Sequence, residues 1–542
     1  MKYNYFYKLI LVIIVSLLTL SIGGCSKTTD FFDYQKEPEA IYKVANKAYL
    51  SMGRVMTLNP VISKDKNVYY IDKLIYSSLF RLDENLLAQN DLAESYVYDN
   101  DKRRLTIKIK SEIKWSDGEP LTANDVKFSI DAYKKASYTK AGLYSMQVNS
   151  IGSVSVDGDS VIIRYRNNDD KSLENLTFPI IPKSDFKNIN EALKQNEKFM
   201  PVGSGPYAVK SYNPYSELIL KANEFYAGVK PENVLIFKVV PNDVETIHLI
   251  EPNLITIAYS EKITRDVDFA NLDSNIESYL SNEVDWVGFN INKTPLSDAK
   301  IRQAIATAID TKSILESAYY GNGVLCDSIY YPGYLGVKNT GSIYKFDKAA
   351  STQLLIKAGY SDLNNDGILE DQYGKDFIID ILVNNDNESR VAAAEVIKKN
   401  LAEIKIKAMI VAVDFENYNR SISNRKFDIY IGGGKMAENY DLTSLLKSYS
   451  GNPAGYNNIT ADKYLDQLKS GISNEEKIMI YKKLKVILSE EIPYYPLVYK
   501  TYGVITSKAF NGKATPMFNN IYIGAEKWSY NYEEIKSKSS KD

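Results

Sequence analysis

The chain has 542 residues, and its 66 lysines and arginines are almost balanced by 68 acidic residues, giving a formal net charge of −2. Hydrophobic residues make up 44% and charged residues 25%, which is ordinary for a soluble globular protein. The balanced charge and the dispersed lysines argue against a nucleic-acid-binding protein. A chain of this length exceeds what one hydrophobic core can hold, so we expect two or three domains.

The first 24 residues are predicted to form a signal peptide. Lys2 and Lys8 give a positively charged start, and residues 9–20 are apolar apart from one serine and one threonine. This apolar stretch is shorter than a membrane-spanning helix and has the length of a secretory signal. We therefore expect the mature protein to begin after it.

Cys25 is the candidate site of lipidation. It directly follows Ile22-Gly23-Gly24, which resembles a bacterial lipobox, where the cysteine is lipidated and becomes the first mature residue. The alternative is an ordinary signal peptide with a cysteine there by chance. Two or more acyl chains, such as palmitate, would hold the protein stably on the outer face of a membrane. The polar residues 25–39 would form the tether. Cys326 would then be the only free thiol, which we expect to be packed in the core.

A strand, a turn and a helix are predicted in succession within residues 105–129. Apolar and polar residues alternate at the start of this stretch, as in a half-buried strand. Gly118 allows a tight turn, and Thr122 or Asn124 can cap a helix that begins near Asp125.

Residues 115–125, Trp-Ser-Asp-Gly-Glu-Pro-Leu-Thr-Ala-Asn-Asp, resemble a signature of one protein family. This family is the extracytoplasmic solute-binding proteins, family 5, which serve oligopeptide, dipeptide and nickel ABC importers. Pro-Val-Gly-Ser-Gly-Pro-Tyr at residues 201–207 is a second match, and residues 284–315 are a third. Together with shorter matches to the same family elsewhere in the chain, these three motifs extend the resemblance over most of residues 50–505.

The resemblance implies an α/β chain with the two-lobed class II periplasmic-binding-protein-like fold, an extra small α/β subdomain and a hinge between the lobes. The ligand would lie between the lobes, and hinge closure would bury it. The implied divisions are the signal peptide 1–24, the lipidated cysteine and tether 25–39, the first part of lobe I 40–78, the small subdomain of lobe I 79–178, the second part of lobe I 179–290, lobe II 291–500 and the C-terminal part of lobe I 501–542.

The candidate ligand-facing segment is residues 427–446. In peptide-binding relatives, the first aspartate of the matching segment pairs with the α-ammonium group of the ligand. The alignment places Glu438 at this position and Asp441 at the second acid. A desolvated carboxylate facing an ammonium group forms a strong charge-assisted hydrogen bond. The alternative is that both acids are solvated loop residues, the commonest state of such side chains. A run of glycines would let a ligand backbone approach closely: Gly432, Gly433 and Gly434.

The resemblance implies a membrane-anchored, monomeric substrate-binding component of an ABC importer, which passes a peptide to the transmembrane permease subunits. It implies no enzymatic activity, no cofactor and no resident metal. The same fold could carry a nickel complex, an oligosaccharide or a signalling peptide. A surface-anchored hydrolase and a non-binding scaffold are the alternatives from other classes. A catalytic triad would depend on His248, the only histidine, and we expect it to be a packed strand residue.

One stretch resembles the beginning of a calcium-binding loop, with Asp362, Asn364, Asp366 and Gly367. The EF-hand pattern requires a glutamate at the twelfth position, which is Tyr373 in this chain. The sequence therefore favours a polar turn with Gly367 at positive φ over a metal site.

Overall fold

The computed structural model describes residues 41–138, 142–166, 170–250, 253–261 and 274–534. Its internal contacts divide the chain into two units, one comprising residues 1–43 with 532–542 and the other residues 44–531. The features discussed below lie in the second unit. The predicted lipidation site, Cys25, lies outside the described residues.

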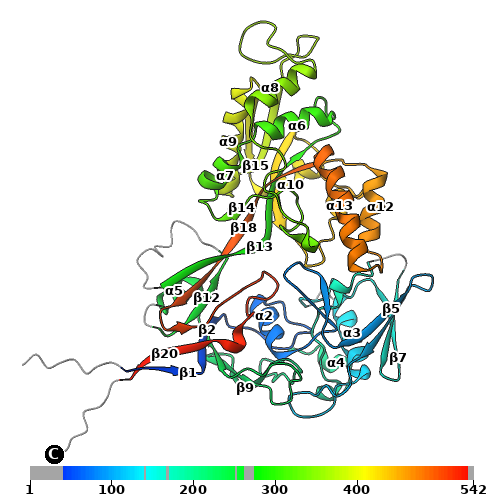
Figure 1. Ribbon diagram of the computed structural model, residues 1–542, viewed down its shortest axis with the longest axis vertical. Coiled ribbons are helices and arrows are strands. Elements are labelled where there is room, and N and C mark those ends of the chain that lie inside the picture. Colours follow the sequence, from blue (N-terminus) through cyan, green and yellow to red (C-terminus); the bar gives the residue numbers. More distant parts are fainter. Residues whose placement is uncertain (1–40, 139–141, 167–169, 251–252, 262–273, 535–542) are drawn as a thin grey trace, which may run out of the picture. The chain divides into compact units, whose positions relative to one another are not determined.

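A long mixed sheet runs through the second unit in the order β16-β15-β17-β13-β18-β12-β2-β11-β10-β9. Its strands are β2 (Lys47–Met52), β9 (Tyr207–Asn213), β10 (Glu217–Ala222), β11 (Val234–Val239), β12 (Ile257–Ser260), β13 (Ser274–Phe289), β15 (Ile378–Asn384), β16 (Lys407–Val413), β17 (Ile429–Lys435) and β18 (Tyr494–Ser507), and β14 (Gly323–Val324) pairs with β18. The antiparallel pair β13 and β18 passes through both halves of the sheet (Figure 1). We call residues 290–493 lobe II, and the remainder of the second unit lobe I; the domain limits given above remain predictions.

Three smaller sheets accompany the long one. The largest of these sheets has the strand order β5-β6-β8-β7. The strands are β5 (Ala93–Asp99), β6 (Arg104–Ile109), β7 (Ile151–Asp157) and β8 (Ser160–Tyr165), then the pair β3 (Phe80–Leu82) and β4 (Ala88–Asn90), and finally β1 (Ile41–Ala45), β20 (Ser529–Glu534) and β19 (Phe510–Asn511).

Helices cover these sheets, and many of them begin where a short polar side chain accepts a backbone N–H, as at Asp65, Asp298 and Asp347. In lobe I they are α2 (Lys66–Ile75), α3 (Ala123–Ser137), α4 (Ile189–Ala192), α5 (Asp243–His248) and the 3₁₀ turns Leu173–Leu176, Lys183–Asp185 and Ala525–Lys527. In lobe II they are α6 (Ala299–Ala308), α7 (Thr311–Ala318), α8 (Lys348–Lys357), α9 (Glu388–Glu403), α10 (Phe415–Ser423), α11 (Thr443–Leu446), α12 (Ile459–Leu468), α13 (Asn474–Glu491) and the turn Tyr334–Gly336.

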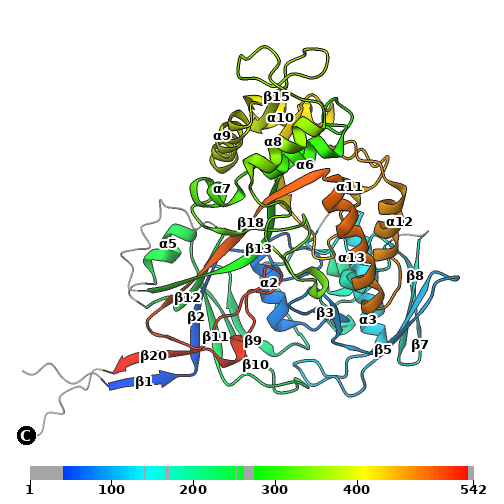
Figure 2. The same cartoon turned by 45° about the horizontal axis from the view of Figure 1, so that its top comes forward.

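The helices of lobe II pack in two groups. Helix α9 packs against β15 and β16, and α6 packs against α8, whereas α12 and α13 lie side by side (Figure 2). Among the described helices, none combines the length and the apolar character that a bilayer span requires.

The predicted strand, turn and helix after residue 104 are confirmed. Gly118 has φ +95° and donates its N–H to the carbonyl of Trp115, closing the turn. Helix α3 begins at Ala123, slightly earlier than predicted, because Thr122 and Asp125 form a capping box.

The second family motif packs against the first and against α2. The N–H of Ser116 donates to the carbonyl of Gly203 at 2.9 Å. A side chain at Gly203 would overlap the carbonyl of Ile75 at the end of α2, and Gly205 donates its N–H to that same carbonyl at 2.8 Å. The two glycines are therefore required by close backbone packing.

A buried ion cluster lies where β13 passes between β17 and β18. Asp285 on β13 is 1% exposed, and its carboxylate contacts Arg390 at 2.8 Å, Tyr319 at 2.8 Å and Lys500 at 3.4 Å. Burial opposes ionisation, but Arg390 and Lys500 outweigh it, so the pKa of Asp285 lies below its ordinary value. Opposite Asp285 in the sheet stands Gly433.

We predict that Gly433→Ala destabilises the protein strongly. The added methyl group would overlap the Asp285 carboxylate and lie 2.8 Å from Arg390 Nη2, which separates the pair. Breaking a buried ion pair typically costs roughly 3–5 kcal/mol. Gly434→Ala is the matched control, because nothing lies within 4 Å of its added methyl group. Urea denaturation of both variants is the measurement, and equal midpoints would contradict the prediction.

Candidate ligand-binding site

A cavity of about 720 Å³ is lined by residues of both lobes. Lobe I contributes residues from 143–150 and 170–175, and lobe II contributes residues from 437–444 and Lys469. Both acids predicted from the sequence, Glu438 and Asp441, line this cavity. The structure therefore brings the two candidate residues to one cavity between the lobes, with side chains that carry carboxylate, amide and hydroxyl groups.

Glu438 is positioned by the chain that follows β17. The N–H of Met436 donates to the carbonyl of Asn282 on β13 at 2.9 Å, which ties the start of this segment to the long sheet. The carboxylate of Glu438 then reaches lobe I, where it accepts hydrogen bonds from the hydroxyl of Tyr69 on α2 and from Thr177 Oγ1 at 3.5 Å. Sequence reasoning missed both partners, because they lie more than 250 positions away and belong to no recognisable motif.

Glu438 carries a carboxylate without a counter-ion. Among the described residues, no lysine, arginine or histidine forms an ion pair with it, and desolvation raises its pKa to about 8. Lys73 lines a neighbouring cavity of about 420 Å³ that Glu438 also borders, but it donates to the carbonyl of Thr177. At neutral pH the carboxyl group of Glu438 is therefore largely protonated, and a cation entering the cavity would favour its ionised form.

Asp441 has a different environment, although it lines the same cavity. Its carboxylate contacts Lys469 Nζ at 2.9 Å and accepts a hydrogen bond from the N–H of Thr443 at 3.0 Å. Burial acts to raise its pKa, but the bonds from Thr443 and Lys469 outweigh this effect and lower it. Asp441 is thus already neutralised by Lys469 and shapes the turn into α11.

Polar contacts join the two lobes around the cavity. Asn439 Nδ2 donates to Asp170 and to Asn175, each at 3.0 Å. Lys477 on α13 forms an ion pair with Glu174 at 2.7 Å, and both side chains are 6% exposed. These contacts link lobe I to lobe II beside the cavity.

The glycine run belongs to β17 rather than to a loop. Strand β17 runs from Ile429 to Lys435, and Gly432, Gly433 and Gly434 pair with β13. A side chain at Gly432 would overlap Tyr430, and Gly433 makes room for Asp285. Packing within lobe II accounts for these two glycines, whereas Gly434 has open space beside it. The proposal that they admit a ligand backbone stays a prediction.

The structure does not support a catalytic role for His248. It ends α5 and is exposed, so the prediction of a packed strand residue is wrong. Cys326, in contrast, is a buried free thiol as predicted, and burial raises its pKa.

Comparison with known families matches residues 88–457 to "Bacterial extracellular solute-binding proteins, family 5 Middle". Oligopeptide-binding protein AppA of Bacillus subtilis is 27% identical over 502 residues, which cover 88% of this chain and 90% of that protein. The structure of AppA from B. subtilis with a nonapeptide has a TM-score of 0.55 and 25% identity over 89% of this chain and 98% of that one. The structure of NikZ from Campylobacter jejuni with Ni(L-His) has a TM-score of 0.61 and 23% identity over 89% and 99%.

The chain belongs to the bacterial extracellular solute-binding proteins, family 5. The predicted α/β periplasmic-binding-protein fold is confirmed. The protein is the extracytoplasmic substrate-binding component of an ABC importer, in a family of non-catalytic solute-binding proteins.

We predict that Lys477→Met shifts the ligand-free protein towards a more open arrangement. The change leaves Glu174 buried without its cation, and separation of the lobes lets water reach that carboxylate. The radius of gyration from small-angle X-ray scattering should therefore increase relative to wild type. Lys482→Met on the exposed face of the same helix is the control. A radius equal to that of wild type and control would contradict the prediction.

Proposed function

We propose that the protein captures peptides with a free N-terminus in the 720 Å³ cavity and delivers them to the transmembrane permease subunits. The observation that carries this proposal is the carboxylate of Glu438, which is desolvated, bonded to Tyr69 and left without a counter-ion. An α-ammonium group entering the cavity would supply the missing positive charge. The relative named as an oligopeptide-binding protein, and the nonapeptide in its structure, support a peptide as the cargo.

The remaining walls of the cavity suit a peptide backbone. Gln147, Asn149, Asn175 and Ser444 offer amide and hydroxyl groups, which can pair with peptide N–H and C=O groups without reading side chains. A cavity of this volume also holds water, and bridging waters cost little binding free energy. We infer that the cavity binds peptides of many different sequences but requires a charged N-terminus on each of them.

A nickel complex is the alternative cargo, since NikZ shares the fold. Nickel prefers imidazole nitrogen among its protein ligands. The residues that line the cavity include no histidine and no cysteine, and His248 is exposed on α5. The donor set of the cavity therefore favours an ammonium group over a directly bound transition metal.

We predict that Glu438→Gln weakens the binding of a peptide with a free N-terminus far more than Asp441→Asn does. Removal of one partner from a buried ion pair typically costs roughly 3–5 kcal/mol, and Asp441 already has Lys469 as its partner. N-acetylation of the peptide removes the same interaction, so acetylation and Glu438→Gln together should cost little more than either alone. The measurement is titration calorimetry of wild type and Glu438→Gln, each with the free and the acetylated peptide.

The pH dependence of binding separates this mechanism from an uncharged contact. Below pH 8 the free Glu438 carboxyl is largely protonated, so pairing with an ammonium group releases one proton. Affinity should therefore rise by about tenfold per pH unit between about pH 6 and 7 and decline once the peptide amine, with a pKa of about 8, loses its proton. Glu438→Gln should make the profile flat in this range. Two results would refute the proposal that Glu438 pairs with the peptide ammonium group. One is an affinity that still rises with pH in Glu438→Gln, and the other is that the losses of binding free energy from acetylation and from Glu438→Gln simply add.

We further propose that the protein acts as a monomer anchored through lipid on Cys25. Cys25→Ala should release the protein from the membrane or leave the precursor uncleaved, because the acylated thiol would be missing. Cell fractionation and labelling with a palmitate analogue are the measurements. Cys326→Ala is the control, since this buried thiol lies in the core of lobe II. A Cys25→Ala protein that is cleaved and still partitions with the membrane would overturn the proposal.

A further inference from the structure

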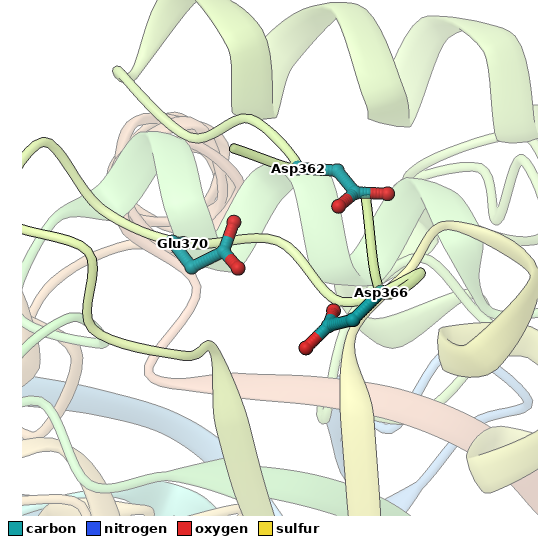
Figure 3. Close-up of side chains that lie close together, drawn as sticks. All are labelled: Asp362, Asp366 and Glu370. Atoms are coloured by element: carbon teal, nitrogen blue, oxygen red, sulfur yellow. The ribbon is translucent and has the colours of Figure 1, made fainter. Parts of the chain in front are cut away.

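The turn between α8 and β15 in lobe II gathers three acidic side chains. Asp362, Asp366 and Glu370 each offer a carboxylate oxygen, and these oxygens lie within 4.8 Å of one another. Figure 3 shows the carboxyl group of Glu370 turned towards those of Asp362 and Asp366. None of these residues lines the peptide cavity described above.

Glu370 is the unusual member of this cluster, because it is almost completely buried. It is 1% exposed, and its Oε2 accepts a hydrogen bond from the N–H of Leu363 at 2.7 Å. Its Oε1 is also buried but has no hydrogen-bond partner. Oδ1 of Asp362 is buried and without a partner as well. Buried carboxylate oxygens are normally paired, so these two atoms face a position that a cation could fill.

The charges of the cluster are only partly balanced. Lys405 contacts Asp362 Oδ2 at 2.7 Å and supplies one positive charge against three carboxylates. If all three are ionised, the excess of two negative charges matches one divalent cation. Carboxylate oxygens in this number, with water or backbone carbonyls completing the shell, suit Ca²⁺, which takes six to eight oxygen ligands in flexible geometry.

We propose that Asp362, Asp366 and Glu370 form a calcium-binding site that locks the turn between α8 and β15. The turn has the rigid base that such a site needs. Ser361 and Glu370 exchange two backbone hydrogen bonds of 2.9 and 3.1 Å, which close the loop. Gly367 has φ +88° and donates its N–H to Asp362. The chain turns at this glycine towards Glu370.

The spacing of the ligands explains why the sequence favoured a metal-free turn. Asp362 and Asp366 occupy the first and fifth positions, as in an EF-hand, but the buried acid stands at the ninth position instead of the twelfth. Gly367 does adopt the predicted positive φ. Tyr373, at the twelfth position, lies beyond the loop that Ser361 and Glu370 close.

The proposal predicts that calcium raises the melting temperature of the peptide-free protein. After dialysis against EDTA and removal of the chelator, about 5 mM CaCl₂ should raise the melting temperature by about 1–2 °C. Calorimetry should give a dissociation constant on the order of 0.1–1 mM, as in extracellular calcium sites. MgCl₂ at the same concentration and ionic strength should give a clearly smaller shift, because Mg²⁺ requires stricter octahedral geometry.

Glu370→Gln and Asp366→Asn should each remove most of the calcium-dependent shift. Glu370→Gln should also leave the calcium-free melting temperature unchanged or higher, because it removes a buried unpaired charge while keeping an acceptor for Leu363. Asp371→Asn is the control: this acid neighbours the cluster but accepts its hydrogen bonds from Tyr373 and Lys375, and it should keep the full shift.

A wild-type protein that does not respond to calcium would overturn the proposal. An equal response in Glu370→Gln, or an equal response to Mg²⁺, would overturn it as well. Because the readout is the metal-dependent stability of the peptide-free protein, it is independent of whether the cavity between the lobes binds a peptide.

Discussion

The backbone pairing of β13 with β18 is the constraint on which the other features depend. These two strands belong to both halves of the long sheet, so the lobes share one hydrogen-bonded core where the chain crosses between them. Strand β17 pairs with β13 and leads directly into the segment that carries Glu438. A glycine at position 433 lets β17 lie close to the buried Asp285. Glu438 lies in the turn that follows β17, three residues beyond its last residue, so the sheet sets where this turn begins.

The acids of this protein are distinguished by whether the fold supplies their cation. Asp285 has Arg390 and Lys500, and Asp441 has Lys469, so these carboxylates are neutralised within the folded chain. Glu438 has only hydroxyl partners. A desolvated carboxylate without a cation disfavours its own ionised form, and a ligand that brings a positive charge would relieve this cost. Carboxylates thus form ion pairs within the fold at two of these positions, and in the proposed function a third would pair with a ligand.

The family resemblance of several motifs predicted the fold class, and short-range patterns predicted the local elements within residues 105–129. Alternation predicted β6, Gly118 predicted the turn, and the candidate cap Thr122 predicted the start of α3 to within a few residues. The partners Tyr69 and Thr177 were not predictable, because they approach Glu438 only after the lobes meet. Glu370 was not singled out in the sequence for another reason: the EF-hand pattern expects its acid three residues later, at Tyr373, whereas the hydrogen bonds between Ser361 and Glu370 close the turn earlier.

In the two proposals, geometry determines which kind of cation Glu438 and Glu370 would bind. Glu438 stands at the edge of a roomy cavity, with Tyr69 and Thr177 as neutral neighbours, and one carboxylate suffices for one ammonium group. Glu370 faces two further carboxylates within a closed turn, a charge density that a single ammonium group would not balance and a space that suits a bare ion. The first site lies between the two lobes, so in the proposed function its cation would enter and leave with lobe movement. The second lies within one lobe, so its cation would serve stability rather than transport.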